Sequence, residues 1–201
     1  MPRISGKDAI KKAIKDYGGG GVGFFQLKDD GDKATVRFLH TDDTDLDVYV
    51  VHSVEVDGRD TYVECLQDDK CPLCQAGNKA GLKVFFSLYS PAEDKILVWD
   101  RGPGILDTIM GLMEKYGHLN NRCYEILRHG KKGDTKTSYQ LFPEDKSEPV
   151  DNAGQPLTRP EITGRFIKVM TAEEMTKLVS DGAAEGGRQQ RAQRRAQGPG
   201  F

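Results

Sequence analysis

The sequence predicts a mostly β protein organised as a small barrel. Between residues 24 and 142, apolar and polar residues alternate with a period of two, and turn signals separate short segments. One amphipathic helix is expected inside this region, over residues 105–116, with Gly117 as its stop signal. Many short strands with a single internal helix are typical of a small antiparallel barrel.

The individual strands follow from alternation and from the turns between them. In residues 46–56 one face is shared by Leu46, Val48, Val50, His52, Val54 and Val56, and Asp57-Gly58 is a hairpin signal. The other strands are expected at 24–28, 33–39, 59–65, 82–90, 95–101, 122–129 and 136–142. We therefore expect the barrel core at 24–142.

The two ends differ from this core. Residues 1–23 are expected to form a basic arm, with a short helix at 4–17 and a glycine linker behind it. Residues 143–181 are expected to be a linker with a last helix at 171–180, which a Thr171/Glu174 capping box would start. Residues 182–201 contain few apolar side chains and are expected to be a disordered basic tail.

The charge is distributed unevenly along the chain. The net charge of −2 combines +3 in residues 1–16 and +4 in residues 186–201 with −9 in the stretch between them. An acidic body does not bind nucleic acid by bulk charge, so such binding would need a local basic groove. The sequence has no secretory signal and no apolar run long enough for a membrane helix, so a cytoplasmic protein is expected.

Cysteine spacing predicts a metal site. Three of the four cysteines, Cys65, Cys71 and Cys74, lie within ten residues, and His52 precedes them with the spacing H-x12-C-x5-C-x2-C. Three thiolates and one imidazole favour zinc, and four protein ligands leave no open position, so the zinc would be structural. Cys123 lies on another predicted strand and is interpreted as a buried apolar residue.

Two alternatives to this ligand set remain open at the level of sequence. A Cys-x2-Cys pair can be a redox pair, although the thioredoxin-like βαβ context is not apparent here. His40, or no histidine at all, could replace His52 as the fourth ligand.

A possible surface for base stacking lies on the pair of strands at 82–90 and 95–101. If a loop at 90–94 joins them, Phe85 faces Trp99 and Tyr89 faces Lys95. In the same register Lys83 faces Arg101, and a bound phosphate would relieve their repulsion. Interleaved aromatic and basic side chains are what a single nucleic-acid strand needs. The full set of candidate DNA contacts is Arg37, Tyr49, Tyr62, Lys83, Phe85, Tyr89, Lys95, Trp99, Arg101, Arg122, Tyr124, Arg128 and Tyr139.

The same pattern has a second interpretation, in which the aromatic side chains form the core. About half of them are expected to be buried, with Phe38, Phe86 and Phe142 as the first candidates. The outcome depends on the register of the hairpin, because a slip of one residue moves every side chain to the other face.

The run from Val51 to Gly117 resembles the zinc-containing single-stranded-DNA-binding proteins of T-even and related bacteriophages, and the resemblance extends over residues 24–142. It implies an OB-fold, a five-stranded Greek-key barrel, with an inserted zinc subdomain held by His52, Cys65, Cys71 and Cys74. It further implies non-sequence-specific, cooperative coating of single strands in phage replication, recombination and repair, in the host cytoplasm. The partners would be further copies of the chain and phage replication or recombination proteins.

Two other classes of function compete with this expectation. A zinc-ribbon module that binds protein, such as a transcription accessory protein, would keep the metal site without a DNA site. An enzyme is not expected, because the sequence offers no convincing carboxylate cluster or Ser/His/Asp order. The basic tail also differs from the acidic C-terminal tail that the resemblance would imply.

Overall fold

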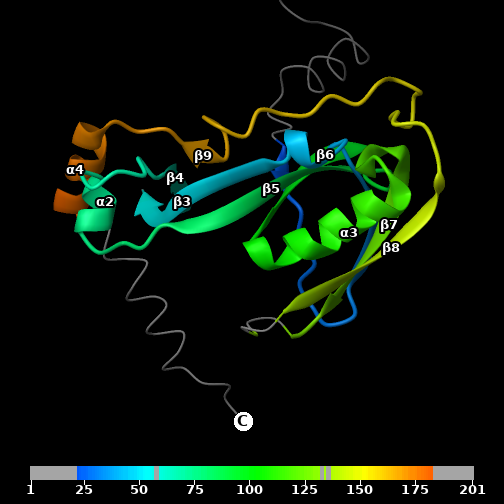
Figure 1. The fold of residues 1–201 in the computed structure, drawn as a ribbon, viewed down its shortest axis with the longest axis horizontal. Coiled ribbons are helices and arrows are strands. Elements are labelled where there is room, and N and C mark those ends of the chain that lie inside the picture. Colours follow the sequence, from blue (N-terminus) through cyan, green and yellow to red (C-terminus); the bar gives the residue numbers. More distant parts are fainter. Residues whose placement is uncertain (1–21, 57–58, 132–133, 135–136, 183–201) are drawn as a thin grey trace, which may run out of the picture.

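The computed structural model describes residues 22–56, 59–131, 134 and 137–182. The helix expected at 4–17 and the basic tail beyond residue 182 lie outside these residues. Within them the chain is mostly β with a few short helices (Figure 1). None of the helices in this part of the chain has both the length and the apolar character that crossing a bilayer requires.

Strands make up more of the chain than helices do. The strands are β1 (Gly23–Phe24), β2 (Lys33–Phe38), β3 (Asp47–Val56), β4 (Arg59–Glu64), β5 (Gly81–Ser90), β6 (Lys95–Arg101), β7 (Arg122–His129), β8 (Ser138–Lys146) and β9 (Ile167–Lys168). The helices are α2 (Pro72–Gln75), α3 (Leu106–Tyr116) and α4 (Ala172–Ser180), with single 3-10 turns at η1 (Asp43–Asp45), η2 (Pro103–Ile105) and η3 (Leu119–Asn121).

Most of the expected elements are confirmed. The central helix begins at Leu106 and ends where Gly117 adopts a φ of 79° and donates its N–H to Met113. The capping box is present at α4, with Thr171 and Glu174 each accepting the other's backbone N–H. In contrast, the first expected strand is reduced to β1, and β8 continues to Lys146, beyond the predicted end of the barrel.

Strand β5 joins the two ends of the sheet. The sheet order is β8-β7-β2-β5-β3-β4-β9, with β6 on the other edge of β5 and β1 beside β6. The edge of β5 that does not face β6 pairs with two strands. It pairs with β2 near Leu88 and with β3 from Gly81 to Phe85. One long strand therefore runs from the region of β2, β5–β8 and α3, which we call the barrel after the sequence prediction, into the region that we call the metal lobe, residues 47–80 and 167–182.

The barrel holds the largest apolar cluster. Val36, Phe38, Phe86, Trp99 and Tyr124 are fully buried in it, and α3 covers it with Ile109. Edge-to-face contacts between the aromatic rings, such as Phe38 with Tyr124 at 5.3 Å, fix their relative positions. The barrel is therefore packed by aromatic side chains, as the second interpretation of the sequence expects.

Phe142 is an exception among the predicted core residues. Its side chain is 46% exposed. It lies opposite Glu125 on β7, with Leu141 and Tyr139 turned to the other face of β8. The prediction that it is buried is wrong, because neighbouring residues on this outer strand alternate between the core and the solvent.

The metal lobe has a small apolar cluster of its own. Val54, Val63 and Leu73 are buried there together with Cys65 and Cys71. Met175 of α4 packs into the same cluster and is fully buried. The C-terminal helix thus belongs to the metal lobe, although the sequence suggests only a short helix after a linker.

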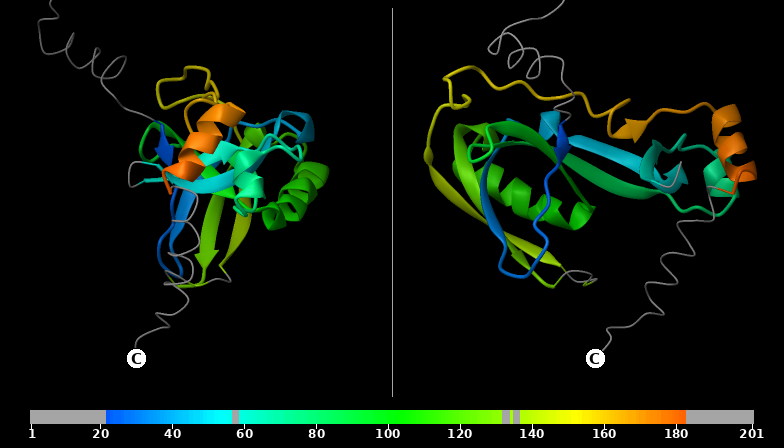
Figure 2. Two further views of the ribbon diagram at one scale, coloured as in Figure 1. Left: turned by 90° about the vertical axis from the view of Figure 1, so that its left-hand side faces the viewer. Right: turned by 180° about the vertical axis from the view of Figure 1, so that it is seen from behind.

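Residues 147–166 form a strap that returns from the barrel to the metal lobe (Figures 1 and 2). At the barrel end, the backbone N–H of Asn152 donates to the Tyr89 hydroxyl at 2.9 Å. In the middle, Arg159 forms ion pairs with Asp45 and Asp47. Beyond the strap, β9 pairs in parallel with β4 and leads into α4. The expected linker is therefore docked on the sheet.

Candidate metal centre and nucleic-acid interface

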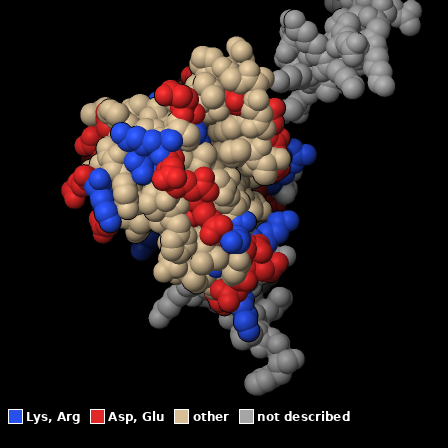
Figure 3. All heavy atoms as spheres, turned by 90° about the vertical axis from the view of Figure 1, so that its right-hand side faces the viewer, with Lys and Arg blue, Asp and Glu red and all other residues tan. Residues whose placement is uncertain are grey.

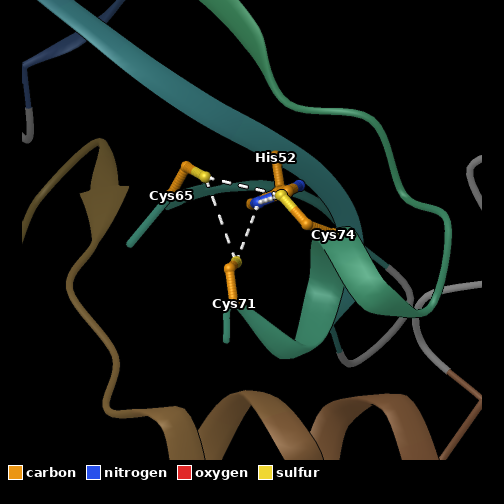
Figure 4. A group of neighbouring side chains, drawn as sticks. All are labelled: His52, Cys65, Cys71 and Cys74. Atoms are coloured by element: carbon orange, nitrogen blue, oxygen red, sulfur yellow. Dashed lines mark hydrogen bonds between the residues drawn. The ribbon is translucent and has the colours of Figure 1, made fainter. Parts of the chain in front are cut away.

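Three elements of the metal lobe place the Cys/His cluster. His52 lies on β3, and Cys65 follows β4, the partner strand of β3, with its N–H bonded to the carbonyl of Val50. Cys71 precedes helix α2, and Cys74 lies within its single turn. Since Pro72 occupies the first position of that turn, its fixed φ favours the helical start that brings both thiols to the same side (Figure 4).

The four side chains converge on one point. All four ligand atoms lie within 4.8 Å of one another. The sulfur of Cys65 is 4.0 Å from that of Cys71 and 3.7 Å from that of Cys74. His52 Nε2 is 3.4 Å from the Cys71 sulfur and 3.6 Å from the Cys74 sulfur. This group could hold a metal ion.

The alternatives left open by the sequence can now be compared with these positions. The cysteines are free thiols, so Cys71 and Cys74 are not joined by a disulfide. His40 lies elsewhere, buried beside β5, where its Nε2 accepts the backbone N–H of Ser87. Cys123 is buried on β7 outside the cluster, as expected.

Asn78 orients the imidazole. Its side-chain oxygen is 3.4 Å from His52 Nδ1, and its amide donates to the carbonyl of Ser53 at 3.0 Å. A proton held on Nδ1 leaves Nε2 free to face the sulfur atoms. Burial lowers the pKa of His52, so the ring is kept in the neutral form that binds metals. The sequence gives no specific signal for Asn78, which acts from 26 residues away.

The thiols influence one another strongly. Burial, together with the neighbouring Cys65 and Cys71 thiols, raises the pKa of Cys74 to about 12. Burial opposes ionisation of Cys71 too, but the backbone N–H groups of Cys74 and Leu66 and the adjacent thiols lower its pKa overall. Three thiolates this close repel one another, and a bound cation would relieve that repulsion.

The predicted register of the β5–β6 hairpin is wrong by one residue. Phe85 pairs with Asp100 and Phe86 pairs with Trp99, and Ser90 pairs with Lys95. The loop therefore has four residues instead of five. Because one residue of slip turns each side chain to the opposite face, Trp99 enters the barrel core with Phe86 and is fully buried. Phe85 and Trp99 do not form a joint stacking surface.

Four of the predicted contacts meet on the outer face of β3, β4 and β5. Tyr49 pairs directly with Lys83, and the rings of Tyr49 and Tyr62 lie 6.0 Å and 5.6 Å from the ring of Phe85. The Lys83 ammonium lies 5.3 Å from the centre of the Tyr62 ring. We call Tyr49, Tyr62, Lys83 and Phe85 the outer aromatic face. Phe85 is fully buried beneath the others, whereas the two tyrosines and Lys83 are half-buried.

Asp100 controls the charge of the outer aromatic face. Its carboxylate accepts the Tyr62 hydroxyl at 2.6 Å and is 3.4 Å from the Lys83 ammonium. Burial and this carboxylate raise the pKa of Tyr62. Lys83 therefore has an acidic partner and does not face Arg101, which lies on the opposite side of the sheet.

A second group of predicted contacts lies at the seam between β6 and β8. The Arg101 guanidinium is 4.9 Å from the Trp99 ring centre and 4.6 Å from the Tyr139 ring centre. Arg128 donates to the Tyr139 hydroxyl at 3.1 Å. Tyr139 is the half-buried member on β8, and Arg128 is almost fully buried.

The remaining predicted contacts have structural roles. Arg37 donates to the backbone oxygens of Asn120 and Ser147, and the Tyr89 hydroxyl bonds Asp94. Both are buried, and Tyr124 is buried in the barrel. Their assignment as DNA contacts is not compatible with these positions. Lys95 forms an ion pair with Glu93, and Arg122 stacks on Tyr116 at 4.7 Å.

A shallow hollow borders the outer aromatic face. It has a volume of about 650 Å³ and is lined by Asp47 and Tyr49 of β3 and by residues 157–163 of the strap. On the side of the molecule that faces right in Figure 1, Lys and Arg side chains are interspersed with Asp and Glu (Figure 3). The charge on this side is thus mixed.

Comparison with known proteins adds no relative: no protein-family model matches the chain, and no curated protein matches it significantly.

Proposed function

We propose that the protein binds single-stranded DNA without sequence preference and that its outer aromatic face contacts the strand. The observation that carries this proposal is the meeting of Tyr49, Tyr62 and Lys83 on three neighbouring strands. Partly exposed aromatic rings offer stacking platforms to any base, and an adjacent ammonium attracts phosphate. Coating of single strands in phage replication, recombination and repair is the role that the sequence resemblance adds.

The strand connections support an OB-type barrel. Strands β2, β5 and β6 form an antiparallel series, α3 follows, and β7 and β8 form a hairpin whose first strand pairs with β2. The seam between β6 and β8 is bridged by the rings of Trp99 and Tyr139, 5.1 Å apart. Partly open five-stranded barrels of this kind bind oligonucleotides on their second and third strands. Here these are β5 and β6, which carry Lys83 and Asp100.

Zinc fits the Cys/His cluster. With zinc–sulfur bonds of about 2.3 Å and zinc–nitrogen bonds of about 2.0–2.1 Å, a tetrahedral site has edges of about 3.8 Å between sulfurs and about 3.6 Å between sulfur and nitrogen. Four of the six observed separations match these edges, at 3.7 and 4.0 Å between sulfurs and at 3.4 and 3.6 Å between sulfur and nitrogen, and all six are within 4.8 Å. A bound zinc ion would neutralise thiolate charge and link β3, β4 and α2. With four protein ligands its role would be structural.

Binding of a labelled dT oligonucleotide, followed by fluorescence anisotropy at several salt concentrations, tests the proposal. We expect affinity to fall as salt rises, because phosphate contacts release counterions. Replacing Tyr49 with Ala should weaken binding by about 1–3 kcal/mol, roughly 5- to 150-fold, since one stacking platform is lost. Tyr116→Ala, a half-buried tyrosine on α3, is the matched control and should bind like the unchanged protein.

Asp100 provides a test in the opposite direction. Asp100→Asn removes the negative charge that holds Lys83, so affinity for the oligonucleotide should rise and its salt dependence should steepen. If neither Tyr49→Ala nor Asp100→Asn changes binding, the outer aromatic face is not the DNA site. If the unchanged protein binds no oligonucleotide even at low salt, the zinc-bearing protein-interaction module becomes the better description.

A further inference from the structure

Arg101 lacks an acceptor for its guanidinium. Of the residues that the structure describes, none accepts a hydrogen bond from it or forms an ion pair with it, and its Nε is shielded from solvent. The Arg101 guanidinium contacts the ring of Trp99. The indole N–H of that ring is also a buried donor without an acceptor among the described residues. Buried donors are normally paired, so two unpaired donors on adjacent side chains indicate a ligand.

The carboxylate nearest in sequence is turned away. Asp100 precedes Arg101 on β6, and adjacent residues of a strand point to opposite faces. The Asp100 carboxylate is bound to Tyr62 and Lys83 on the outer aromatic face. Asp32, beside Arg128, accepts the backbone N–H groups of Lys28 and Asp29. Neither acid offers an oxygen to Arg101.

A second cation lies close to Arg101. Arg128 donates to the Tyr139 hydroxyl, and its other bonds go to backbone carbonyls and to Thr137. Burial, and to a smaller extent the charge of Arg128, lower the pKa of Arg101, while Tyr139 and the Asp100 carboxylate act against this shift, and the guanidinium remains charged. The rings of Trp99 and Tyr139, whose centres are 5.1 Å apart, both lie against the same side of the guanidinium, at 4.9 Å and 4.6 Å.

We propose that Arg101 and the indole N–H of Trp99 form an oxyanion site at the β6–β8 seam, suited to a phosphate group. A guanidinium presents a planar fork of donors that matches phosphate oxygens, and its low hydration suits a partly buried site. The site lies on the opposite face of the sheet from the outer aromatic face and stands independently of the proposed DNA binding. The phosphate can come from a free anion or from the backbone of a nucleic-acid strand.

Trp99 reports on this site directly, because it is the only tryptophan of the chain. Inorganic phosphate is titrated into the full-length, metal-loaded protein at constant ionic strength, with chloride as the balancing anion. We expect a saturable change in tryptophan emission with phosphate and none with chloride. A response to phosphate no larger than the response to chloride overturns the proposal.

Variants locate the response. Arg101→Met keeps an aliphatic stem beside the two rings but removes the charge, so the phosphate response should vanish. Arg101→Lys keeps the charge but loses the fork, and affinity for phosphate should fall about tenfold or more. Lys115→Met is the control, because Lys115 also stacks on a ring, that of Tyr116 at 5.2 Å, but on α3. A full response in Arg101→Met, with thermal unfolding and metal content unchanged, overturns the assignment.

An oligonucleotide distinguishes the two sources of phosphate. If the site takes the DNA backbone, Arg101→Met weakens oligo-dT binding and inorganic phosphate competes with the oligonucleotide. If it takes a free anion, phosphate binds without affecting the oligonucleotide, and the site holds even where the proposed DNA binding fails. Either result supports the oxyanion site. If the unchanged protein responds to phosphate but does not bind oligo-dT, only the proposed DNA-binding function is refuted.

Discussion

The barrel and the metal lobe share strand β5 but bury very different numbers of apolar side chains. In the barrel, thirteen buried residues form one cluster, among them Phe38, Phe86 and Trp99. In the lobe the corresponding cluster has six, and two of those are the cysteines Cys65 and Cys71. The barrel can therefore be held by apolar burial, whereas the lobe has to obtain its stability from another source.

Because of this contrast, substitutions in the barrel core and in the Cys/His cluster should destabilise different parts of the protein. A change in the aromatic core should lower the stability of the barrel and leave the Cys/His cluster intact, because His52 and the three clustered cysteines lie in the metal lobe. A change in a ligand should act on the lobe and on α4, since Met175 packs against the ligand cysteines.

The largest effect is expected for Cys71→Ser. The apparent free energy of metal binding at structural sites is about 10–16 kcal/mol and is coupled to folding, so loss of the metal should unfold the lobe. Elemental analysis should find no bound zinc, and hydrogen exchange should accelerate in β4 and α4 before it does in β7. Cys123→Ser, at a buried cysteine outside the cluster, is the control and should retain the metal. Retention of zinc by Cys71→Ser would refute the assignment.

A cavity in the barrel should have the next largest effect. Ile109→Ala shortens the fully buried side chain that α3 packs into the barrel core, and it should lower the free energy of unfolding by about 2–5 kcal/mol. Chemical denaturation measures this value, and zinc content should not change. The neighbouring Met110 is 37% exposed, so Met110→Ala should cost less than about 1 kcal/mol. Equal losses in both variants would contradict the packing described.

Loss of the α4 cap should have a smaller, local effect. Thr171→Ala removes the side chain that accepts the N–H of Glu174 and should cost about 0.5–2 kcal/mol. Faster hydrogen exchange confined to α4 would be the expected signature. Thr176→Ala, within the same helix, should change exchange by less, and comparable effects of the two would argue against the cap.

The smallest effect is a dependence on pH through His40. Burial, and secondarily Arg159, lowers the pKa of this histidine, while the Asp45 carbonyl and the Asp45 and Asp47 carboxylates act against the shift. Below the ordinary histidine pKa of about 6.5, His40 is protonated in the unfolded chain but stays neutral in the folded chain. The free energy of unfolding should therefore decrease as the pH falls below about 6.5.

His40→Gln removes this titration, and its unfolding midpoint should depend less on pH between about 7 and 5.5. The measurement uses zinc-loaded protein, in which His52 would be bound. An identical pH profile for both proteins would exclude His40 as the cause.

The metal cluster could be predicted from the sequence because its spacing is local. Two cysteines three residues apart fit on one helical turn, and the pairing of β3 with β4 brings His52 near Cys65, as the hairpin signal Asp57-Gly58 predicts. The short strands and α3 could be predicted for the same reason, since period and stop signals act within one segment. These features do not depend on how distant segments pack.

The stacking surface could not be predicted because it depends on the length of one loop. Residues Pro91 to Asp94 turn the chain in four residues, with Asp94 at a φ of 47° and its carboxylate bound to the Tyr89 hydroxyl. The sequence fits a five-residue loop equally well. With a five-residue loop Trp99 would lie on the surface opposite Phe85, and with a four-residue loop it lies in the core opposite Phe86. Alternation along a strand identifies two faces but does not say which face is inside.

The strap was expected to be a linker because its apolar residues are few and follow no period. Ile162 is nevertheless buried on the outer side of the sheet beside Phe85, together with Ile167 of β9. Arg159 reaches Asp45, more than a hundred residues earlier in the chain. Contacts over such distances leave no local signature in the sequence.

The chain crosses between barrel and metal lobe three times, from β2 into β3, along β5, and through the strap. Two bodies joined at three places have no free hinge between them, so rigid-body rotation of the lobe is suppressed. A polymer lying across both would meet surfaces already set at a fixed angle, and little of its binding free energy would go into domain closure. Cutting the strap with a protease while leaving β5 intact should give the lobe back its rotational freedom.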